Sequence, residues 1–231
     1  DQTTGYHENL EVIKTRKPNL VLIAGDLVES GGEQRDWDEF WGHNRMLAAQ
    51  VPILPALGNH EYYAGPGDFG EWEMQASERS VSKYKEYFSL PNNYASNPAH
   101  HERYYSLEYG PVTLIVLDLG NGDPHQGERD TNWSLIGEKE GGVAPAWSEG
   151  SEQYRWLEQA LANAQRSARF TFVMFHYCPY TSGIHGLPPG APNHEDKDNA
   201  SSVPLQSLTP LFIRYGVDLL LNGHDEMAEH S

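Results

Sequence analysis

Four short polar motifs in this sequence carry side-chain types that bind metal ions. They are Gly25-Asp26, Gly58-Asn59-His60-Glu61, Phe175-His176 and Gly223-His224-Asp225-Glu226. Each motif follows directly on a short apolar run, and a run of this kind predicts a buried strand. Because the carboxyl ends of neighbouring strands open onto one crevice in an open α/β sheet, we expect the motifs to converge. Carboxylate, amide and imidazole groups in one place suit hard to borderline metal ions.

The elements expected to position these motifs alternate between short strands and amphipathic helices. Predicted strands cover residues 20–24, 51–57, 104–108, 112–117, 170–175 and 217–221. Predicted helices cover residues 7–17, 36–50, 80–87, 153–165 and 205–215. The apolar spacing of the first helix predicts that Leu10, Val12 and Ile13 face inward. Residues 121–150 and 182–203 lack periodicity and are predicted to form long loops, which are often functional in compact domains.

Length and composition indicate one α/β domain. A chain of 231 residues can bury a sizeable core. Its apolar content is 38%, its mean hydropathy is −0.64, and no apolar run approaches the ~18 residues that a membrane span needs. The net charge of −17 argues against general nucleic-acid binding, which requires a basic surface. The single cysteine, Cys178, excludes an internal disulfide and is expected to be a buried, unreactive thiol.

The order of the four motifs resembles that of the calcineurin-like metallophosphoesterases, over nearly the whole chain from Pro18 to His224. Further landmarks resemble the purple-acid-phosphatase-like branch of that superfamily: Tyr104-Tyr105-Ser106, Gln153 to Leu157, and His176 with Pro179, Tyr180 and His185. The resemblance implies an α/β (α+β) fold, a four-layer sandwich of two mixed β-sheets flanked by helices. It also implies a centre of two metal ions that hydrolyses phosphate esters.

The resemblance also bears on where the domain starts and stops. Family members place a strand before the first helix and further strands after Gly223-His224, and this sequence has neither. Residues 1–231 are therefore expected to form a single metallophosphoesterase domain that is incomplete at both termini. A sheet that lacks a central strand leaves buried backbone groups unpaired, which is costly.

The resemblance implies that Asp26, Asn59, His176 and His224 hold one metal ion. Asp26 is the expected bridging ligand, since a shared carboxylate offsets the repulsion between two nearby cations. Asn59 offers an amide oxygen that adds no charge. Taken alone, Asp26 could instead cap a turn, and Gly58-Asn59 could form a plain turn.

Two further histidines are expected to contact the substrate. The resemblance places His60 at the scissile bond, where it would stabilise phosphoryl charge or protonate the leaving oxygen. It makes His185 a ligand of the substrate phosphate, with an ordinary surface histidine as the alternative. Both residues are predicted to be catalytic and neither is predicted to bind metal.

The ligands of the other metal ion depart from the family pattern. Asp1 stands about where the family has an early Asp ligand, Glu226 where it has a second His, and Glu29 where it has a Tyr. A carboxylate can bind a hard cation, so Asp1 and Glu226 are predicted ligands. Without a Tyr ligand, the tyrosinate-to-iron colour of purple enzymes is not expected. The alternative is a degraded site that binds metal weakly or not at all.

One leading hypothesis and two rivals follow. The leading hypothesis is hydrolysis of small-molecule phosphate esters by a metal-activated hydroxide, with two divalent or trivalent ions (Mn, Fe or Zn) as cofactors. The choice between monoesters and diesters stays open, and Trp133, Trp147 and Tyr180 could stack on a substrate or anchor the loops. The rivals are a non-catalytic binding module on this scaffold and a different metallohydrolase.

The acidity, the absence of an initial Met and the resemblance favour a secreted or periplasmic protein.

Overall fold

Short strands and longer helices alternate along the chain. The computed structural model describes all residues except 1–3, 64, 66–73, 121–143, 188–202 and 231. The helices are α1 (Thr4–Arg16), α2 (Gln34–Ala48), α3 (Met74–Tyr87), α4 (Glu152–Ser167) and α5 (Thr209–Tyr215). The strands are β1 (Val21–Ile23), β2 (Ile53–Pro55), β3 (Tyr105–Tyr109), β4 (Val112–Val116), β5 (Phe170–Met174) and β6 (Leu219–Leu221). Short 3₁₀ turns are η1 (His60–Tyr62), η2 (Pro98–His100), η4 (Ile184–Gly186) and η5 (Val203–Leu208).

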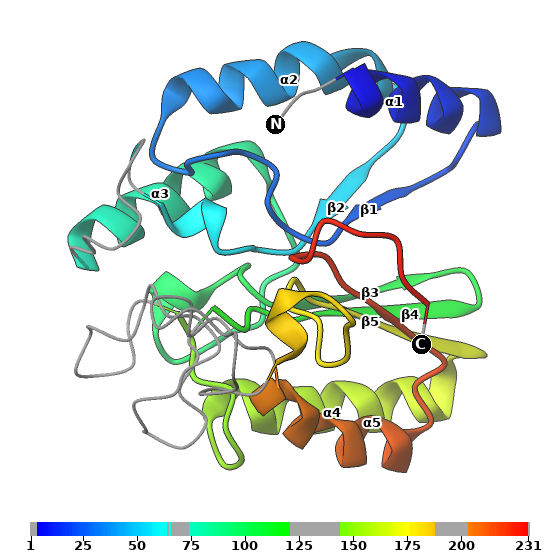
Figure 1. Ribbon diagram of the computed structural model, residues 1–231. Helices are drawn as coiled ribbons and strands as arrows, with labels where there is room; N and C mark the ends of the chain where they lie inside the picture. The colour runs from blue at the N-terminus through cyan, green and yellow to red at the C-terminus, as the bar shows by residue number, and fades with distance from the viewer. Residues whose placement is uncertain (1–3, 64, 66–73, 121–143, 188–202, 231) are drawn as a thin grey trace.

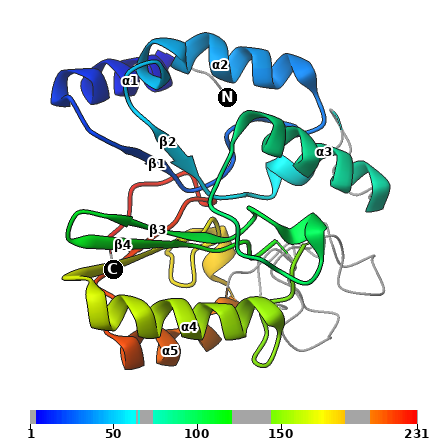
Figure 2. The same cartoon turned by 180° about the vertical axis from the view of Figure 1, so that it is seen from behind.

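These elements are stacked in four layers (Figure 1). Helices α1 and α2 form one outer layer over the sheet of β1 and β2. The sheet of β3 to β6 lies beneath it, and α4 and α5 cover the far side of that second sheet. The view from behind shows the same order of layers, with α3 at one side of the stack (Figure 2). The expected α/β fold of two sheets flanked by helices is confirmed.

The strands are paired so that four loops can meet. β1 and β2 are parallel, with Val21 opposite Ile53. The second sheet has the order β3-β4-β5-β6, in which β3 and β4 form the predicted antiparallel hairpin and the other pairs are parallel. The polar motifs follow β1, β2, β5 and β6, each of which is paired, within the described residues, only with parallel neighbours. Loops at the carboxyl ends of such strands are where open α/β sheets place their sites.

Strand β4 is buried on both faces and joins the two apolar cores. Because successive side chains of a strand point to opposite faces, Leu114 and Val116 lie in the core shared with β1, β2, α2 and α3. Ile115, together with Leu117 just beyond the strand, faces the core shared with α4 and α5. A strand buried on both faces is a nearly continuous apolar run, which is how residues 112–117 appear in the sequence.

Helix termini follow local chemistry, and two predictions about helices are wrong in detail. Ser151 caps α4 by accepting a hydrogen bond from the Tyr154 backbone N–H at 3.2 Å. Val12 of α1 is 54% exposed rather than turned inward, because Leu10 already occupies the buried face. The helix predicted at 205–215 is divided into η5 and α5, since Pro210 lies in the first turn of α5 and has no N–H to continue the helix before it.

A buried ion pair ties η1 to the end of β4. Arg103 Nε lies 2.9 Å from Asp118 Oδ2, and the two side chains are 1% and 0% exposed. The Tyr62 hydroxyl donates to the same carboxylate at 2.6–2.7 Å. Gln153 of α4 bonds both the backbone N–H and the carbonyl of Asp118, at 3.0 and 2.8 Å. Because η1 directly follows Asn59, this network fixes a candidate metal ligand relative to the second sheet.

Replacing Asp118 with Ala is expected to destabilise the fold by about 3–5 kcal/mol, because it leaves the Arg103 charge buried without its partner. The loss corresponds to a fall in Tm of about 6–20 °C for a domain of this size. Thermal unfolding followed by circular dichroism measures it. Asp38→Ala, on the surface of α2, is the matched control and should change Tm little. Equal Tm shifts for the two variants would contradict the structural role of the ion pair.

Within the part of the chain that the structure describes, no helix has both the length and the apolar character that crossing a bilayer requires.

Candidate metal centre

Four side chains from the loops after β1, β2, β5 and β6 converge on one point. His176 Nε2 lies 3.0 Å from Asp26 Oδ2, 3.0 Å from Asn59 Oδ1 and 3.1 Å from His224 Nδ1. Asp26, His176 and His224 form a cluster whose potential ligand atoms all lie within 4.8 Å of one another. The structure therefore brings together the four residues that were predicted to share one metal ion.

The ring of His176 is oriented so that its lone pair can face a cation. Its Nδ1–H donates to the Ala24 carbonyl at 2.7 Å, which directs Nε2 toward the convergence point. The Asn59 amide is oriented in the same way, because its Nδ2 donates to the Tyr63 hydroxyl at 2.6 Å and turns Oδ1 inward. Ligating histidines commonly have their second nitrogen fixed by a carbonyl in this manner.

The donor set fits a bound metal ion. A carboxylate oxygen, an amide oxygen and an imidazole nitrogen lie 3.0–3.1 Å from His176 Nε2, and all four atoms can offer a lone pair to a cation. His224 Nε2 is buried and has no hydrogen-bond partner within the described residues. Such a set is stable only with positive charge at its centre, and mixed N/O ligands suit Zn, Mn or Fe.

The charges of the cluster are coupled. Burial opposes ionisation of Asp26, but His176, His60 and His224 more than offset it and hold the pKa of Asp26 below its ordinary value. Burial would lower the pKa of His176, but the Asp26 carboxylate outweighs burial and raises it. Burial, followed by the neighbouring imidazoles of His176 and His185, holds the pKa of His224 well below its ordinary value. Without metal, one proton on His176 therefore takes the place of the cation.

Metal binding is accordingly expected to release about one proton per chain near neutral pH. A raised folded pKa means that His176 keeps its proton up to a pH above its ordinary value of about 6.5, and the metal must displace that proton. Affinity should therefore rise with pH, up to about tenfold per unit, until this pKa is passed. Calorimetric titrations with Zn²⁺ or Mn²⁺ in two buffers of different ionisation heat measure the released proton. An affinity that is independent of pH between about 6 and 8 would contradict the assignment.

Close backbone approach explains why glycines precede the ligands. A Cβ on Gly58 would lie 2.1 Å from Asp26 Oδ1, and one on Gly25 would lie 2.6 Å from His176 Nδ1. Asp26 and His224 themselves have positive φ angles of 53° and 75°, a region that non-glycine residues rarely adopt. Strained residues of this kind cluster at functional sites, where the surrounding structure holds them in place.

His60 lies beside the cluster. Its Nδ1 bonds the Glu29 carbonyl at 2.7 Å, and its backbone N–H donates to Asp26 Oδ1 at 3.1 Å. The ring packs on Tyr63 with centroids 4.7 Å apart. The prediction that His60 points to a different place from Asn59 agrees with this position.

Glu61 is a site residue to which the sequence interpretation assigned no role. Its side chain is fully buried and accepts three backbone hydrogen bonds, from Asp26, Leu27 and Gly58, at 2.9, 2.7 and 2.7 Å. Burial and the Asp26 carboxylate raise the pKa of Glu61 to about 7. One carboxylate thus joins the loop after β1 to the loop after β2. In the sequence, the only indication that Glu61 belongs to the site is its place in the Gly-Asn-His-Glu motif.

The remaining predicted site residues are distributed as follows. His185 lies against His224, with ring centroids 3.9 Å apart. Glu226 and Glu29 are exposed and are not members of the described cluster. Asp1 lies outside the described residues. The structure therefore assembles one predicted ligand set and does not bring Glu226 to it.

Other side chains near the site have structural roles. Cys178 donates its thiol hydrogen to the Gly223 carbonyl at 2.6 Å, and burial raises the pKa of the thiol to about 11, as expected for an unreactive cysteine. Trp147 is 3% exposed and anchors its loop, whereas Tyr180 is 48% exposed and its hydroxyl bonds Thr209. Trp133 lies outside the described residues.

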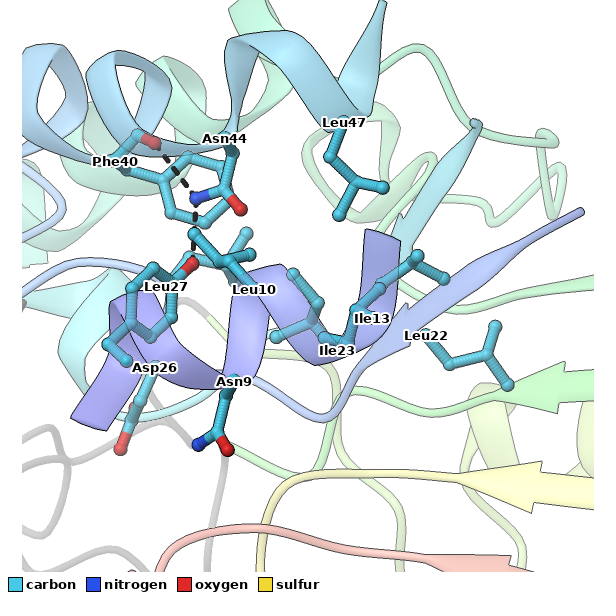
Figure 3. Close-up of a pocket in the computed structure, with 12 residues that line it drawn as sticks. Asn9, Leu10, Ile13, Leu22, Ile23, Asp26, Leu27, Phe40, Asn44 and Leu47 are labelled. Atoms are coloured by element: carbon cyan, nitrogen blue, oxygen red, sulfur yellow. Dashed lines mark hydrogen bonds between the residues drawn. The ribbon is translucent and has the colours of Figure 1, made fainter. Parts of the chain in front are cut away.

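An apolar pocket of about 310 Å³ lies behind the site, between α1, β1 and α2. Figure 3 shows Leu10, Ile13, Leu22 and Leu47 along this pocket, with Asp26 at its edge. The lining that the structure describes is mostly apolar and contains no cationic side chain, so it offers few groups to a charged ester. The polar chemistry is concentrated at the cluster instead.

Comparison with known proteins agrees with this arrangement. The sequence matches the calcineurin-like phosphoesterase family over residues 3–225. An uncharacterised protein of Mycobacterium tuberculosis is 30% identical over 217 residues, which cover 93% of this chain and 35% of that protein. The protein named "Probable inactive purple acid phosphatase 24" of Arabidopsis thaliana is 28% identical over 228 residues, covering 93% and 29%. The solved structure of purple acid phosphatase PPD1 from yellow lupin has a TM-score of 0.60 at 21% identity, covering 94% of this chain and 32% of that one.

Fold and site together define an α/β protein whose two sheets present metal-type ligands from the loops after their parallel strands. The chain belongs to the calcineurin-like phosphoesterase family, and its relatives place it in the purple-acid-phosphatase-like branch, as the sequence motifs predicted. It spans about a third of the length of the relatives reported above.

Proposed function

We propose that this domain hydrolyses phosphate esters with the help of metal ions held at the cluster of Asp26, Asn59, His176 and His224. The observation that carries the proposal is the convergence of a carboxylate oxygen, an amide oxygen and a second imidazole nitrogen within 3.0–3.1 Å of His176 Nε2. Membership of a phosphoesterase family supports phosphorus as the reacting centre. The substrates are small-molecule phosphate esters.

We propose two ions that share Asp26, with Asp1 and Glu226 as additional ligands of the second ion. When bound, such ions supply Lewis acidity, which lowers the pKa of a coordinated water and neutralises charge on the phosphoryl oxygens. The backbone N–H of His60 holds Asp26 Oδ1, so that Oδ2 faces His176. Glu61 holds the two ligand loops together beneath them.

His60 is the proposed catalytic acid. Its Nδ1–H bond to the Glu29 carbonyl is compatible with both the neutral and the protonated ring, so Nε2 is the atom that can gain and lose a proton. Packing on Tyr63 fixes the plane of the ring. An imidazole held in this way can donate a proton to a leaving oxygen, or a hydrogen bond to a developing phosphoryl charge.

Metal removal and restoration tests the proposal. Purified full-length protein should hydrolyse p-nitrophenyl phosphate or bis-p-nitrophenyl phosphate, lose that activity on dialysis against a chelator, and regain it with Mn²⁺, Zn²⁺ or Fe²⁺. The better of the two substrates separates a monoesterase from a diesterase. Asp26→Asn should lose activity even with metal present in excess. Turnover that is unaffected by the chelator would overturn the proposal.

The rival function is a non-catalytic binding module, and one observation favours it. Glu226, which replaces a His of the family pattern, is exposed and separate from the cluster, so the second ion lacks a described ligand set of its own. A binding module should hold one ion or none and turn over neither ester. Metal content measured on the same sample as turnover distinguishes the two functions.

A further inference from the structure

A buried carboxylate beside the metal ligands has no role in the function described so far. Asp225 follows His224 directly, yet its side chain is only 3% exposed. Its Oδ2 has no hydrogen-bond partner within the described residues. Burying a carboxylate is costly unless it is hydrogen-bonded. The contacts of Oδ1 therefore indicate the role of the buried Asp225 side chain.

The contacts of Asp225 are made with the loop that carries His185. Asp225 Oδ1 accepts a hydrogen bond from the His185 backbone N–H at 3.4 Å and lies 3.8 Å from the ring Nε2. The same loop approaches the carboxylate at Gly183, where a Cβ would lie 2.6 Å from the Asp225 Cγ. A glycine at this position is what allows the loop to rest on the carboxylate.

The contact fixes the ring of His185 against a metal ligand. The rings of His185 and His224 are 3.9 Å apart between centroids and tilted by 37°. The His185 side chain is 15% exposed, so the ring is largely covered where it packs on His224. Because Asp225 is adjacent to His224 in sequence and bonded to His185 in space, one residue sets the spacing between a proposed metal ligand and a proposed phosphate ligand.

We infer that Asp225 is a positioning residue, which holds His185 where it can bind the phosphate group of a ligand at the metal centre. The inference rests on the proposed function in that it takes the centre to bind phosphate. It goes beyond that function by assigning a role to a residue outside the predicted ligand set. Asp225 acts through its hydrogen bond and its packing, and it does not contact the substrate.

Phosphate affinity provides a test that does not depend on turnover. Calorimetric titration of inorganic phosphate into the metal-loaded protein should give a Kd about tenfold weaker for Asp225→Ala than for wild type, the loss expected for one hydrogen bond to a charged group. His185→Ala should weaken binding by a similar factor. The double variant should be no weaker than either single variant, because the two residues act as one unit. Asp225→Asn, which keeps an oxygen acceptor for the His185 N–H, should stay within about twofold of wild type.

A second carboxylate on the same segment supplies the matched control. Glu229 also accepts a backbone N–H from the loop, that of Ser182, at 2.9 and 3.2 Å, but from the exposed side. Glu229→Ala should bind phosphate as wild type does. Metal content and Tm, measured on every variant, identify any loss that is due to misfolding. If Asp225→Ala turns over p-nitrophenyl phosphate, its KM should rise about tenfold with kcat nearly unchanged.

The outcomes separate this inference from the proposed function. Wild-type protein that binds phosphate without turnover, and loses affinity in Asp225→Ala, keeps the positioning role and removes the catalytic one. Wild-type affinity in Asp225→Ala overturns the positioning role, and so do additive losses in the double variant or an equal loss in Glu229→Ala. Wild-type protein that neither binds phosphate nor hydrolyses an ester overturns both.

Discussion

His60→Ala is expected to lower kcat for phosphate ester hydrolysis by about 10²–10⁴-fold while the metal content stays at the wild-type value. The size of the loss is that of a positioned acid–base group, and the retained metal follows from geometry. His60 contacts the Glu29 carbonyl and the Tyr63 ring through its side chain, whereas its link to Asp26 is made by the backbone N–H. Truncating the imidazole leaves that backbone link in place.

The measurement combines steady-state kinetics with elemental analysis of the same preparation. His43→Ala removes an imidazole on α2, away from the cluster, and should leave both turnover and metal content unchanged. If His60→Ala lost its metal, His60 would be part of the metal-binding set and its assigned role would be wrong. If turnover fell less than about threefold, no proton transfer could be assigned to it.

Glu61→Ala is expected to have the largest effect on stability and to abolish tight metal binding. The substitution leaves three buried backbone N–H groups, those of Asp26, Leu27 and Gly58, without an acceptor. At about 1–3 kcal/mol for each unsatisfied group, the expected loss is roughly 3 kcal/mol or more. Because these groups belong to the two ligand loops, after β1 and after β2, the loops should separate and the metal should dissociate.

Thermal unfolding and metal titration measure these two effects. Glu61→Gln should lie between wild type and Glu61→Ala, since its oxygen can replace Oε2 while its NH₂ faces the Leu27 donor. Glu86→Ala, on the exposed face of α3, is the matched control and should change neither quantity. Wild-type metal affinity in Glu61→Ala would show that the loops hold their ligands without this carboxylate.

The fold and the ligand cluster were predictable from local patterns. Each strand is a short apolar run with a clear boundary, and each ligand follows a strand end. Once the strands are arranged in sheets, Asp26, Asn59, His176 and His224 have little freedom to lie anywhere other than at one crevice. Helices α1, α2 and α4 were predicted within about three residues for the same reason, since apolar periodicity is a local signal, whereas α3 begins at Met74, six residues before its predicted start.

The residues that support the site were not predictable, because their roles depend on burial. Glu61 and Asp225 are ordinary carboxylates in the sequence, and only the folded chain shows that both are covered and that each bonds the backbone of a distant loop. Arg103 and Asp118 form their ion pair through tertiary packing that no spacing rule contains. Val12 was misplaced because the period of a short helix does not decide which of two neighbouring apolar residues is covered.

The most direct test of the central claim is anomalous diffraction from crystals of the full-length protein grown with Mn²⁺ or Zn²⁺. The account predicts a strong peak between His176 Nε2, Asp26 Oδ2, Asn59 Oδ1 and His224 Nδ1, at the ligand distances of about 2.0–2.2 Å that such ions adopt. A second peak on the other side of Asp26 would establish the pair of ions. No peak at this point in crystals that bind metal elsewhere would contradict the assignment of these four residues as a metal centre.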